Sequence, residues 1–302
     1  MNTDDWNLLL GRIKDGKCTP FLGAGVNYGI LPLGGRIAQD WAAQEGFPLR
    51  SSEDLANVAQ FLAVKYDDPM YPKERILKQL ALDKKPDFSQ PDEHLDCLRA
   101  LAGLPLPVYL TTNYDDLMVE ALRHTDPPKN PRREFCRWHK GLKSLPSVFG
   151  AAARYTPDYA NPVVFHLHGS NDYVESLVLT EDDYIDFLVN VSRRQKLLPP
   201  RIQEAMTNAS LLFIGYRLKD INFRVIYRGL VQSMDGSQRR LSVTVQVTPP
   251  DDHAGAPEKA EQFLTDYFDE LKVRVYWGTA AQFAKELRYR WTTFHDGRAS
   301  NP

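Results

Sequence analysis

Two short polar stretches, each directly after an apolar run, carry the side chains best suited to chemistry in this chain. The stretch VYLTTNYDD supplies a hydroxyl, an amide and a carboxylate at Thr111, Asn113 and Asp115. His168 ends the apolar run VVFHL, and a histidine can exchange a proton near neutral pH. Polar side chains of these types at strand ends are candidates for a catalytic or binding site.

Each of these residues also has a purely structural interpretation. Asn113 or Asp115 would make a good N-cap for the helix expected next, although capping does not account for the whole Thr-Thr-Asn-Tyr-Asp run. A histidine at a strand end is commonly structural, and we interpret His166 as a packed residue. We expect His168 to lie in a crevice beside the Asn113 loop, which favours a catalytic role for it.

Glycines after two other apolar runs predict close approaches of the backbone to a ligand. In TPFLGAGVNY the residues Gly23, Ala24 and Gly25 follow an apolar run, a pattern that lets backbone N–H groups approach a pyrophosphate. Gly215 has the same position in LLFIGYRLKD, with Asp220 near the expected start of the next helix. The alternatives are a plain tight turn at the first glycines and helix capping by Asp220.

The apolar runs predict the sheet that must position these residues. Continuously apolar strands that alternate with amphipathic helices indicate a parallel sheet covered on both faces, so we predict an α/β fold with a doubly wound, Rossmann-like sheet. Ligands of such sheets bind outside the carboxyl ends of the strands, where the polar residues above would meet. The predicted strands are Cys18–Leu22, Val108–Thr111, Val163–Leu167, Leu211–Ile214, Leu241–Val247 and Val273–Tyr276.

Two long stretches between the predicted strands are interpreted as insertions in a single domain of residues 1–302. Residues from about 30 to 105 have helical texture, notably in Asp54–Val64 and Lys73–Leu82, and are too many for a plain crossover. Residues Thr125–Pro162 hold several prolines and a cluster of arginines and lysines, which predicts loops with short helical pieces. The basic residues form either a solvated face or a surface for phosphates or an acidic partner.

Composition excludes several classes of protein. The chain has 37 Lys and Arg against 39 Asp and Glu, so it has no overall field to attract nucleic acid or an anionic membrane, and direct nucleic-acid binding is not expected. Cys18, Cys97 and Cys136 form no CxxC pair and no HExxH is present, so no metal site is predicted. The first residues lack a signal-peptide pattern and no apolar run is long enough for a membrane span, so a cytoplasmic protein is expected.

Taken in order, four motifs of this chain resemble those of the sirtuin-like family, in particular its bacterial branch of NAD-degrading antiphage defence proteins. The motifs are FLGAGVN, TTNYDD, FHLHGS and FIGYRLKDIN, and they run from about Cys18 to Asn222. The resemblance implies that the protein takes NAD as its substrate and cleaves the nicotinamide–ribose bond, giving nicotinamide and ADP-ribose.

The family's functional residues carry over to matching positions of this chain. The resemblance implies that Asn113 and Asp115 serve the nicotinamide ribose and that His168 is the catalytic base. The implied NAD-binding positions are Gly23, Ala24, Gly25, Asn27, Thr111, Gly215 and Asp220. Sirtuins usually have serine where this chain has Asn27, which can still donate hydrogen bonds. The chain cannot build the four-cysteine zinc module of the family's deacetylases, which favours hydrolysis over deacylation.

Two other functions are compatible with the same residues. One is an NAD-dependent protein deacylase, and the other is a dinucleotide-binding sensor or interaction subunit without turnover. An uncontrolled NAD hydrolase would harm its own cell, so we expect a homo-oligomer that works with a partner, and the resemblance points to a HerA-type ATPase. Trp138, Arg133 and Arg137 are residue types enriched at interfaces and are expected at such a contact, unless they cover the protein's own core.

Overall fold

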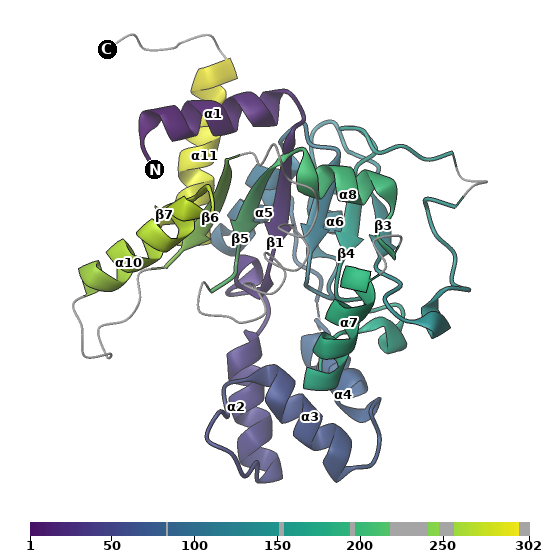
Figure 1. The fold of residues 1–302 in the computed structure, drawn as a ribbon. Helices are drawn as coiled ribbons and strands as arrows, with labels where there is room; N and C mark the ends of the chain where they lie inside the picture. Colours follow the sequence, from purple (N-terminus) through teal and green to yellow (C-terminus); the bar gives the residue numbers. More distant parts are fainter. Residues whose placement is uncertain (83, 151–153, 194–196, 218–240, 248–256, 296–302) are drawn as a thin grey trace.

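The sheet at the centre of the molecule is built from parallel strands. The computed structural model describes residues 1–82, 84–150, 154–193, 197–217, 241–247 and 257–295. Its strands form a seven-stranded sheet in the order β3-β4-β2-β1-β5-β6-β7 (Figure 1). They are β1 (Cys18–Leu22), β2 (Val108–Thr111), β3 (Arg132–Phe135), β4 (Val163–His166), β5 (Ser210–Ile214), β6 (Ser242–Gln246) and β7 (Val273–Trp277). Every neighbouring pair is parallel, which confirms the predicted doubly wound α/β class.

All six predicted strands are present, and a seventh was missed. Every residue of the central strands β1 and β5 is buried, which is why their sequences CTPFL and SLLFI are mostly apolar. The unpredicted strand, β3, lies in the proline-containing stretch where only loops and short helical pieces were expected, and that expectation is wrong here. This strand sits at the sheet edge and pairs only with β4, so its sequence RREF keeps an exposed Arg132 and shows no apolar run.

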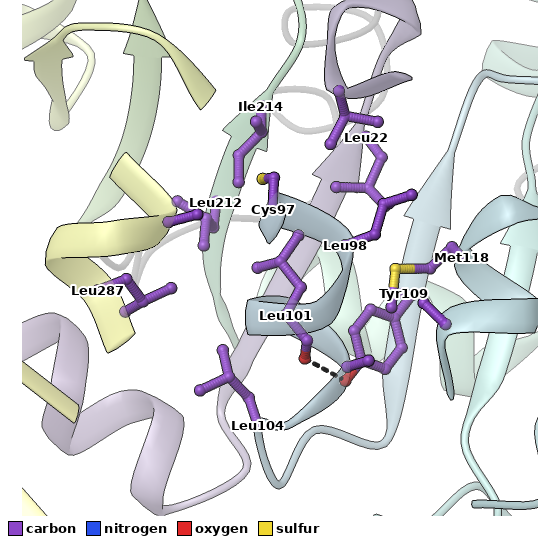
Figure 2. Close-up of a cluster of buried hydrophobic side chains, with 14 of the residues drawn as sticks. Leu22, Cys97, Leu98, Leu101, Leu104, Tyr109, Met118, Leu212, Ile214 and Leu287 are labelled. Carbon is purple, nitrogen blue, oxygen red and sulfur yellow. Dashed lines mark hydrogen bonds between the residues drawn. The ribbon is translucent and has the colours of Figure 1, made fainter. Parts of the chain in front are cut away.

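Helices cover both faces of the sheet and enclose two cores. One face carries α1 (Thr3–Lys14), α5 (Asp96–Ala102), α6 (Leu117–Arg123) and α11 (Ala280–His295). Figure 2 shows Leu98 and Leu101 of α5 packed against Leu22 and Tyr109 of the sheet, with the Tyr109 hydroxyl donating to the Leu101 carbonyl at 3.0 Å. The other face carries α7 (Glu181–Arg193), α8 (Pro200–Thr207) and α10 (Pro257–Glu270). A three-layer α/β/α arrangement results.

A third cluster belongs to the helices between β1 and β2. These are α2 (Gly34–Glu45), α3 (Leu55–Lys65) and α4 (Tyr71–Leu80), in the region where helical texture was expected. Asp54 caps α3 by accepting from the Ala56 N–H at 3.0 Å. Their core includes Trp41 and Leu62 and extends to Leu177, and Figure 1 shows the three helices grouped with α7 beyond one end of the strands. Short 3₁₀ helices complete the fold: η1 (Ala24–Asn27), η2 (Glu93–Leu95), η3 (Lys140–Leu142) and η4 (Val174–Ser176).

The strand order defines where a ligand would bind. The chain starts the sheet at β1, continues to β2 and β4 on one side, and then crosses back to β5 on the other side of β1. The strand order therefore reverses at β1, and the crevice outside the carboxyl ends of β1, β2 and β5 is the expected binding place in an open parallel sheet. Among the helices of the described ranges, none has the length and apolar character that crossing a bilayer requires.

Candidate functional site

The loops that follow β1 and β5 meet through glycines. The Gly23 N–H donates to the Ile214 carbonyl at 2.8 Å, and the Gly25 N–H donates to the Gly215 carbonyl at 3.0 Å. Gly215 has a φ of +85°, and a Cβ at this position would lie 2.4 Å from the Val26 nitrogen and 2.5 Å from the Gly23 oxygen. Glycine is therefore required at position 215 both for its backbone conformation and for the contact between the two loops.

One N–H of the predicted phosphate loop has no acceptor within the described residues. The N–H groups of Gly23 and Gly25 are already bonded to the β5 side, as described above. Ala24 is exposed, and within the described part of the chain its N–H has no acceptor. Contact of Gly23, Ala24 and Gly25 with a pyrophosphate stays a prediction, and Ala24 is the residue of the three whose N–H is available for it.

Asn113 is fixed at the carboxyl edge of the sheet by its neighbours. The Thr111 hydroxyl donates to the Leu22 carbonyl at 3.1 Å and accepts from the Asn113 N–H at 2.9 Å. The Asn113 Nδ2 donates to the Gly23 carbonyl at 3.2 Å. Thr111 is buried and its hydroxyl bonds only to backbone groups in the described residues, so it holds the loop, while Asn113 links β2 to the loop after β1.

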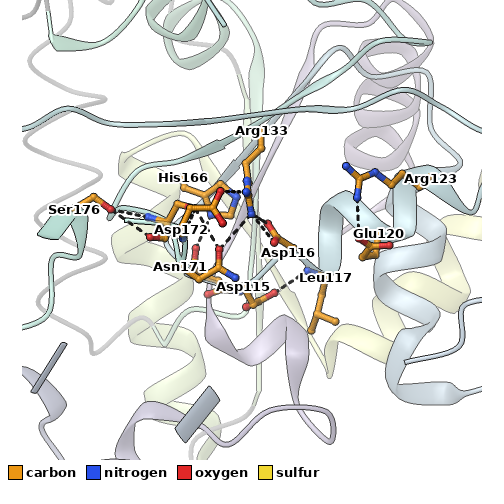
Figure 3. Close-up of polar contacts among 12 residues, drawn as sticks. Asp115, Asp116, Leu117, Glu120, Arg123, Arg133, His166, Asn171, Asp172 and Ser176 are labelled. Atoms are coloured by element: carbon orange, nitrogen blue, oxygen red, sulfur yellow. Dashed lines mark hydrogen bonds and ion pairs between the residues drawn. The ribbon is translucent and has the colours of Figure 1, made fainter. Parts of the chain in front are cut away.

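Asn27 and Asp115 form a pair beside Asn113. The Asn27 Nδ2 donates to Asp115 Oδ2 at 2.8 Å. Figure 3 shows Asp115 beside Leu117 at the start of α6, where the other carboxylate oxygen accepts from the Leu117 N–H at 3.0 Å. The bond to the Leu117 N–H thus accounts for one oxygen of Asp115 and leaves the other to Asn27. Burial raises the pKa of Asp115 to about 6. The Asn27 Oδ1 is buried without a partner in the described residues, so a bound ligand or water has an acceptor to satisfy there.

The structure places His168 beneath α7 rather than in an open crevice. Its side chain is 3% exposed and meets the rings of Tyr184 and Phe187 edge-on, at centroid distances of 5.2 and 5.1 Å. Burial lowers the pKa of His168 to about 3, so the imidazole is neutral. The His168 Nε2 has no hydrogen-bond partner in the described residues. The expected open position is wrong because the apolar face of α7 covers this end of β4.

Val178 connects His168 to the loop that carries Asn113. The Val178 N–H donates to the His168 carbonyl at 2.9 Å, and the Val178 carbonyl accepts from the Tyr114 hydroxyl at 2.7 Å. The two predicted catalytic segments, after β2 and after β4, therefore share one bridging residue at the same edge of the sheet.

Tyr216 is a site residue that the sequence analysis did not select. Its hydroxyl donates to the Leu22 carbonyl at 2.9 Å and lies 2.8 Å from the Thr112 Oγ1. Its ring packs edge-on against Phe21 at a centroid distance of 5.8 Å. Tyr216 thereby braces the ends of β1, β2 and β5, and its position directly after the strand-end Gly215 was the feature that could have identified it.

The edge strand β3 contributes an arginine to the same end of the sheet. Figure 3 shows Arg133 between Asp116 and Asp172; its Nη1 lies 2.7 Å from the Asp116 Oδ1 and 3.3 Å from the Asn171 Oδ1. Arg133 therefore ties the loop after β2 to the loop after β4. The basic side chain serves these internal ion pairs, and the neighbouring Arg137 likewise pairs with Glu134 at 2.7 Å.

Trp138 does not lie on a contact surface. Its side chain is 4% exposed, and its Nε1 donates to the Ser176 carbonyl at 2.8 Å. The expectation that Trp138 marks an interface is wrong, because the loop after β3 folds back and packs this ring into the core on the α7 side of the sheet. Trp138 instead covers the protein's own core, which was the alternative interpretation.

Two further predictions concern Asp220 and metals. Asp220 lies outside the described residues. Within the described ranges no group of three or more histidine, cysteine, aspartate or glutamate side chains could hold a metal ion, and Cys18, Cys97 and Cys136 are separate, free and buried.

Comparisons with known proteins identify relatives of this chain. A family model described as a SIR2-like domain matches residues 107–272. The chain is 26% identical over 231 residues to an "NAD(+) hydrolase ThsA" of Enterococcus faecium, which covers 75% of this chain and 42% of the relative. It is 24% identical to the protein of the same name from Bacillus cereus (strain MSX-D12), an alignment that covers 76% of this chain and 43% of the relative. It is 28% identical to that of Cytobacillus dafuensis, where the alignment covers 72% of this chain and 38% of the relative. The chain thus spans less than half the length of these relatives.

Proposed function

This chain belongs to the SIR2-like family, and we propose that it hydrolyses the nicotinamide–ribose bond of NAD. The relatives named NAD(+) hydrolase support this reaction class, at identities of 26%, 24% and 28%. The structural observation that carries the proposal is the position of Asn113. Its side chain is held by the Gly23 carbonyl at the switch point of the sheet, next to the Asn27–Asp115 pair with its unpartnered buried Asn27 Oδ1.

The proposed reaction consumes one water and releases one proton. The bond between the ribose C1′ and the pyridinium nitrogen breaks, and its electron pair neutralises the nicotinamide ring. Water then adds to C1′ and loses a proton, which gives ADP-ribose. Because nicotinamide leaves as a neutral molecule, the site must stabilise a positively charged ribosyl centre and position water, and it needs no strong acid.

The side chains of the site match these requirements. The Asn113 Oδ1 makes no hydrogen bond within the described residues, so it can accept from the attacking water while its Nδ2 stays on Gly23. The Asp115 carboxylate, when ionised, would favour positive charge that develops on the ribose. His168 is neutral and its Nε2 has no partner in the described residues; it would accept a proton from water or a ribose hydroxyl if contact with NAD raises its pKa from about 3 toward neutrality.

We assign the nucleotide-binding role to the loops after β1 and β5. The exposed Ala24 N–H is a donor for a phosphate oxygen, and Thr111 acts by holding the loop. We further propose that the protein is a cytoplasmic effector of antiphage defence and that it acts as a homo-oligomer with a HerA-type ATPase. The need to restrain NAD destruction supports regulation by assembly.

The test is incubation of the purified chain with NAD, with nicotinamide measured by chromatography and ADP-ribose by mass spectrometry. Asn113→Ala and His168→Ala should each lower nicotinamide release by roughly 10²–10⁴-fold, because they remove a positioning group and a proton acceptor. The matched controls are Asn130→Ala and His124→Ala, at exposed positions on other loops, which should keep the wild-type rate.

Other outcomes separate the alternative functions. Saturable NAD binding without nicotinamide release, with the chain alone and with a co-expressed ATPase, would favour a dinucleotide sensor. Nicotinamide release that depends on an added acetyl-lysine peptide would favour a deacylase. Full activity of His168→Ala would remove this histidine from the mechanism, and a normal rate for Asn113→Ala would do the same for the amide.

A further inference from the structure

His166 is a buried histidine that the proposed reaction does not use directly. It is the last residue of β4, its side chain is 0% exposed, and its Nδ1 lies 2.9 Å from the backbone carbonyl of Asn113. The two flanking strands fix its backbone, because the His166 carbonyl accepts from the Cys136 N–H at 2.9 Å and the next N–H, of Leu167, donates to the Thr111 carbonyl at 2.7 Å. The direction of the ring is therefore set by the sheet.

The contact defines the protonation of the ring. A carbonyl oxygen only accepts, so the Nδ1 of His166 must carry the hydrogen. Burial lowers the pKa of His166, which keeps the ring neutral; the nearby Asp116 acts to raise the pKa and Arg133 acts to lower it. The His166 Nε2 is buried and has no partner in the described residues, as expected of an unprotonated nitrogen in an apolar place.

With this contact, Asn113 is held at three points. Its N–H donates to the Thr111 hydroxyl at 2.9 Å, its carbonyl accepts from His166 at 2.9 Å, and its Nδ2 donates to the Gly23 carbonyl at 3.2 Å. The first two bonds fix the peptide planes on both sides of the residue, and the third fixes the amide. The Asn113 Oδ1 is the group that remains for a ligand or water among the described contacts.

We propose that His166 is a positioning residue: it orients Asn113 for the attacking water by donating from Nδ1 to the Asn113 carbonyl. This inference rests on the proposed NAD hydrolysis. It distinguishes the two histidines of FHLHGS, since His168 would accept a proton and His166 would hold the amide. A histidine that merely filled core space could be replaced by any side chain of similar size without a change in turnover.

The kinetic test compares two substitutions that differ in hydrogen bonding. His166→Leu keeps an apolar filler and removes the donor, and it should lower kcat by about 10- to 100-fold with KM for NAD within about threefold of wild type. His166→Asn can place its Nδ2 near the former Nδ1 and should restore kcat to within about threefold of wild type. The control is Val164→Ala, two residues before His166 on the same face of β4, which should lower Tm and leave kcat unchanged.

Each kinetic outcome decides the proposal. An unchanged kcat for His166→Leu would overturn it. A loss that His166→Asn does not restore would also overturn it, because the effect would then follow ring shape and not the hydrogen bond. A raised KM with normal kcat would assign His166 to substrate binding instead. If wild-type protein releases no nicotinamide, the proposed hydrolysis fails, and the contact itself is still decided by the following measurement.

The second readout is independent of activity. Long-range ¹H–¹⁵N spectra report the protonation of the 7 histidines of the chain, and the His166 signals are those missing from His166→Asn. We expect the neutral ring to carry its hydrogen on Nδ1 and none on Nε2, with a pKa below the value of about 6.5 that is usual for an exposed histidine. A neutral ring with its hydrogen on Nε2 and none on Nδ1 could not donate to the Asn113 carbonyl and would refute the contact. If His166→Leu does not fold, the wild-type spectrum alone decides.

Discussion

Replacing Gly215 by alanine should separate the two loops that form the switch point of the sheet. The new methyl group would lie 2.4 Å from the Val26 nitrogen and 2.5 Å from the Gly23 oxygen, and both are backbone atoms that cannot rotate away. The φ of +85° adds strain, since a residue with a Cβ pays roughly 1–2 kcal/mol in the left-handed region. Overpacking of this kind typically costs a further 1–3 kcal/mol or so.

The expected loss of stability is therefore about 2–5 kcal/mol. An unfolding entropy of about 2.1 cal/mol/K per residue converts this into a fall in Tm of about 3–8 °C for a chain of 302 residues. NAD binding should weaken more than stability alone requires, because the Gly25–Gly215 hydrogen bond of 3.0 Å holds the Ala24 loop in place.

The measurements are thermal unfolding by circular dichroism and NAD binding by calorimetry. The matched control is Gly11→Ala in α1, where a Cβ meets nothing within 4 Å, and where alanine should raise Tm by about 1–2 °C through its better helix propensity. A Gly215→Ala protein with wild-type Tm would refute the steric argument. A destabilised variant with unchanged NAD affinity would show that the loop contact serves the fold and not the ligand.

Two further predictions concern pH and metals. Burial raises the pKa of Asp115 from the 3.8 of an ordinary aspartate to about 6, so ionisation of this carboxyl group opposes folding. The free energy of unfolding should therefore fall as the pH rises from about 4 to about 6. In measurements of Tm against pH, Asp115→Asn should lack this part of the dependence. Nicotinamide release should rise over the same range with an apparent pKa near 6, since His168 stays neutral throughout; a rate that is flat from about pH 5 to about pH 8 would contradict this assignment. Dialysis against EDTA should change neither Tm nor rate, because the described residues contain no cluster of three metal ligands, and a loss restored by zinc would revive the deacylase alternative.

Several features of the site could be predicted because they follow from the periodicity of the chain. A strand buried on both faces is mostly apolar, so β1 and β5 were recognisable, and parallel strands bring their carboxyl ends to one edge. The meeting of Gly25 with Gly215, and of Asn27 with Asp115, is consistent with that rule. The edge strand β3 escaped prediction because a strand with one partner keeps polar residues.

The sequence by itself determined which side chains reach this edge, and only the tertiary structure decided what each one is free to do. Thr111 looked like a ligand residue, but its hydroxyl is used by the Leu22 carbonyl and the Asn113 N–H. His168 looked accessible, but α7, which begins well after it in the chain, covers its ring. Burial and hydrogen-bond partners come from segments distant in sequence, such as Tyr216 and Leu22, so no local pattern can encode them. The protonation of the site therefore depends on the packing of the three layers, while its residue types depend on the strand ends.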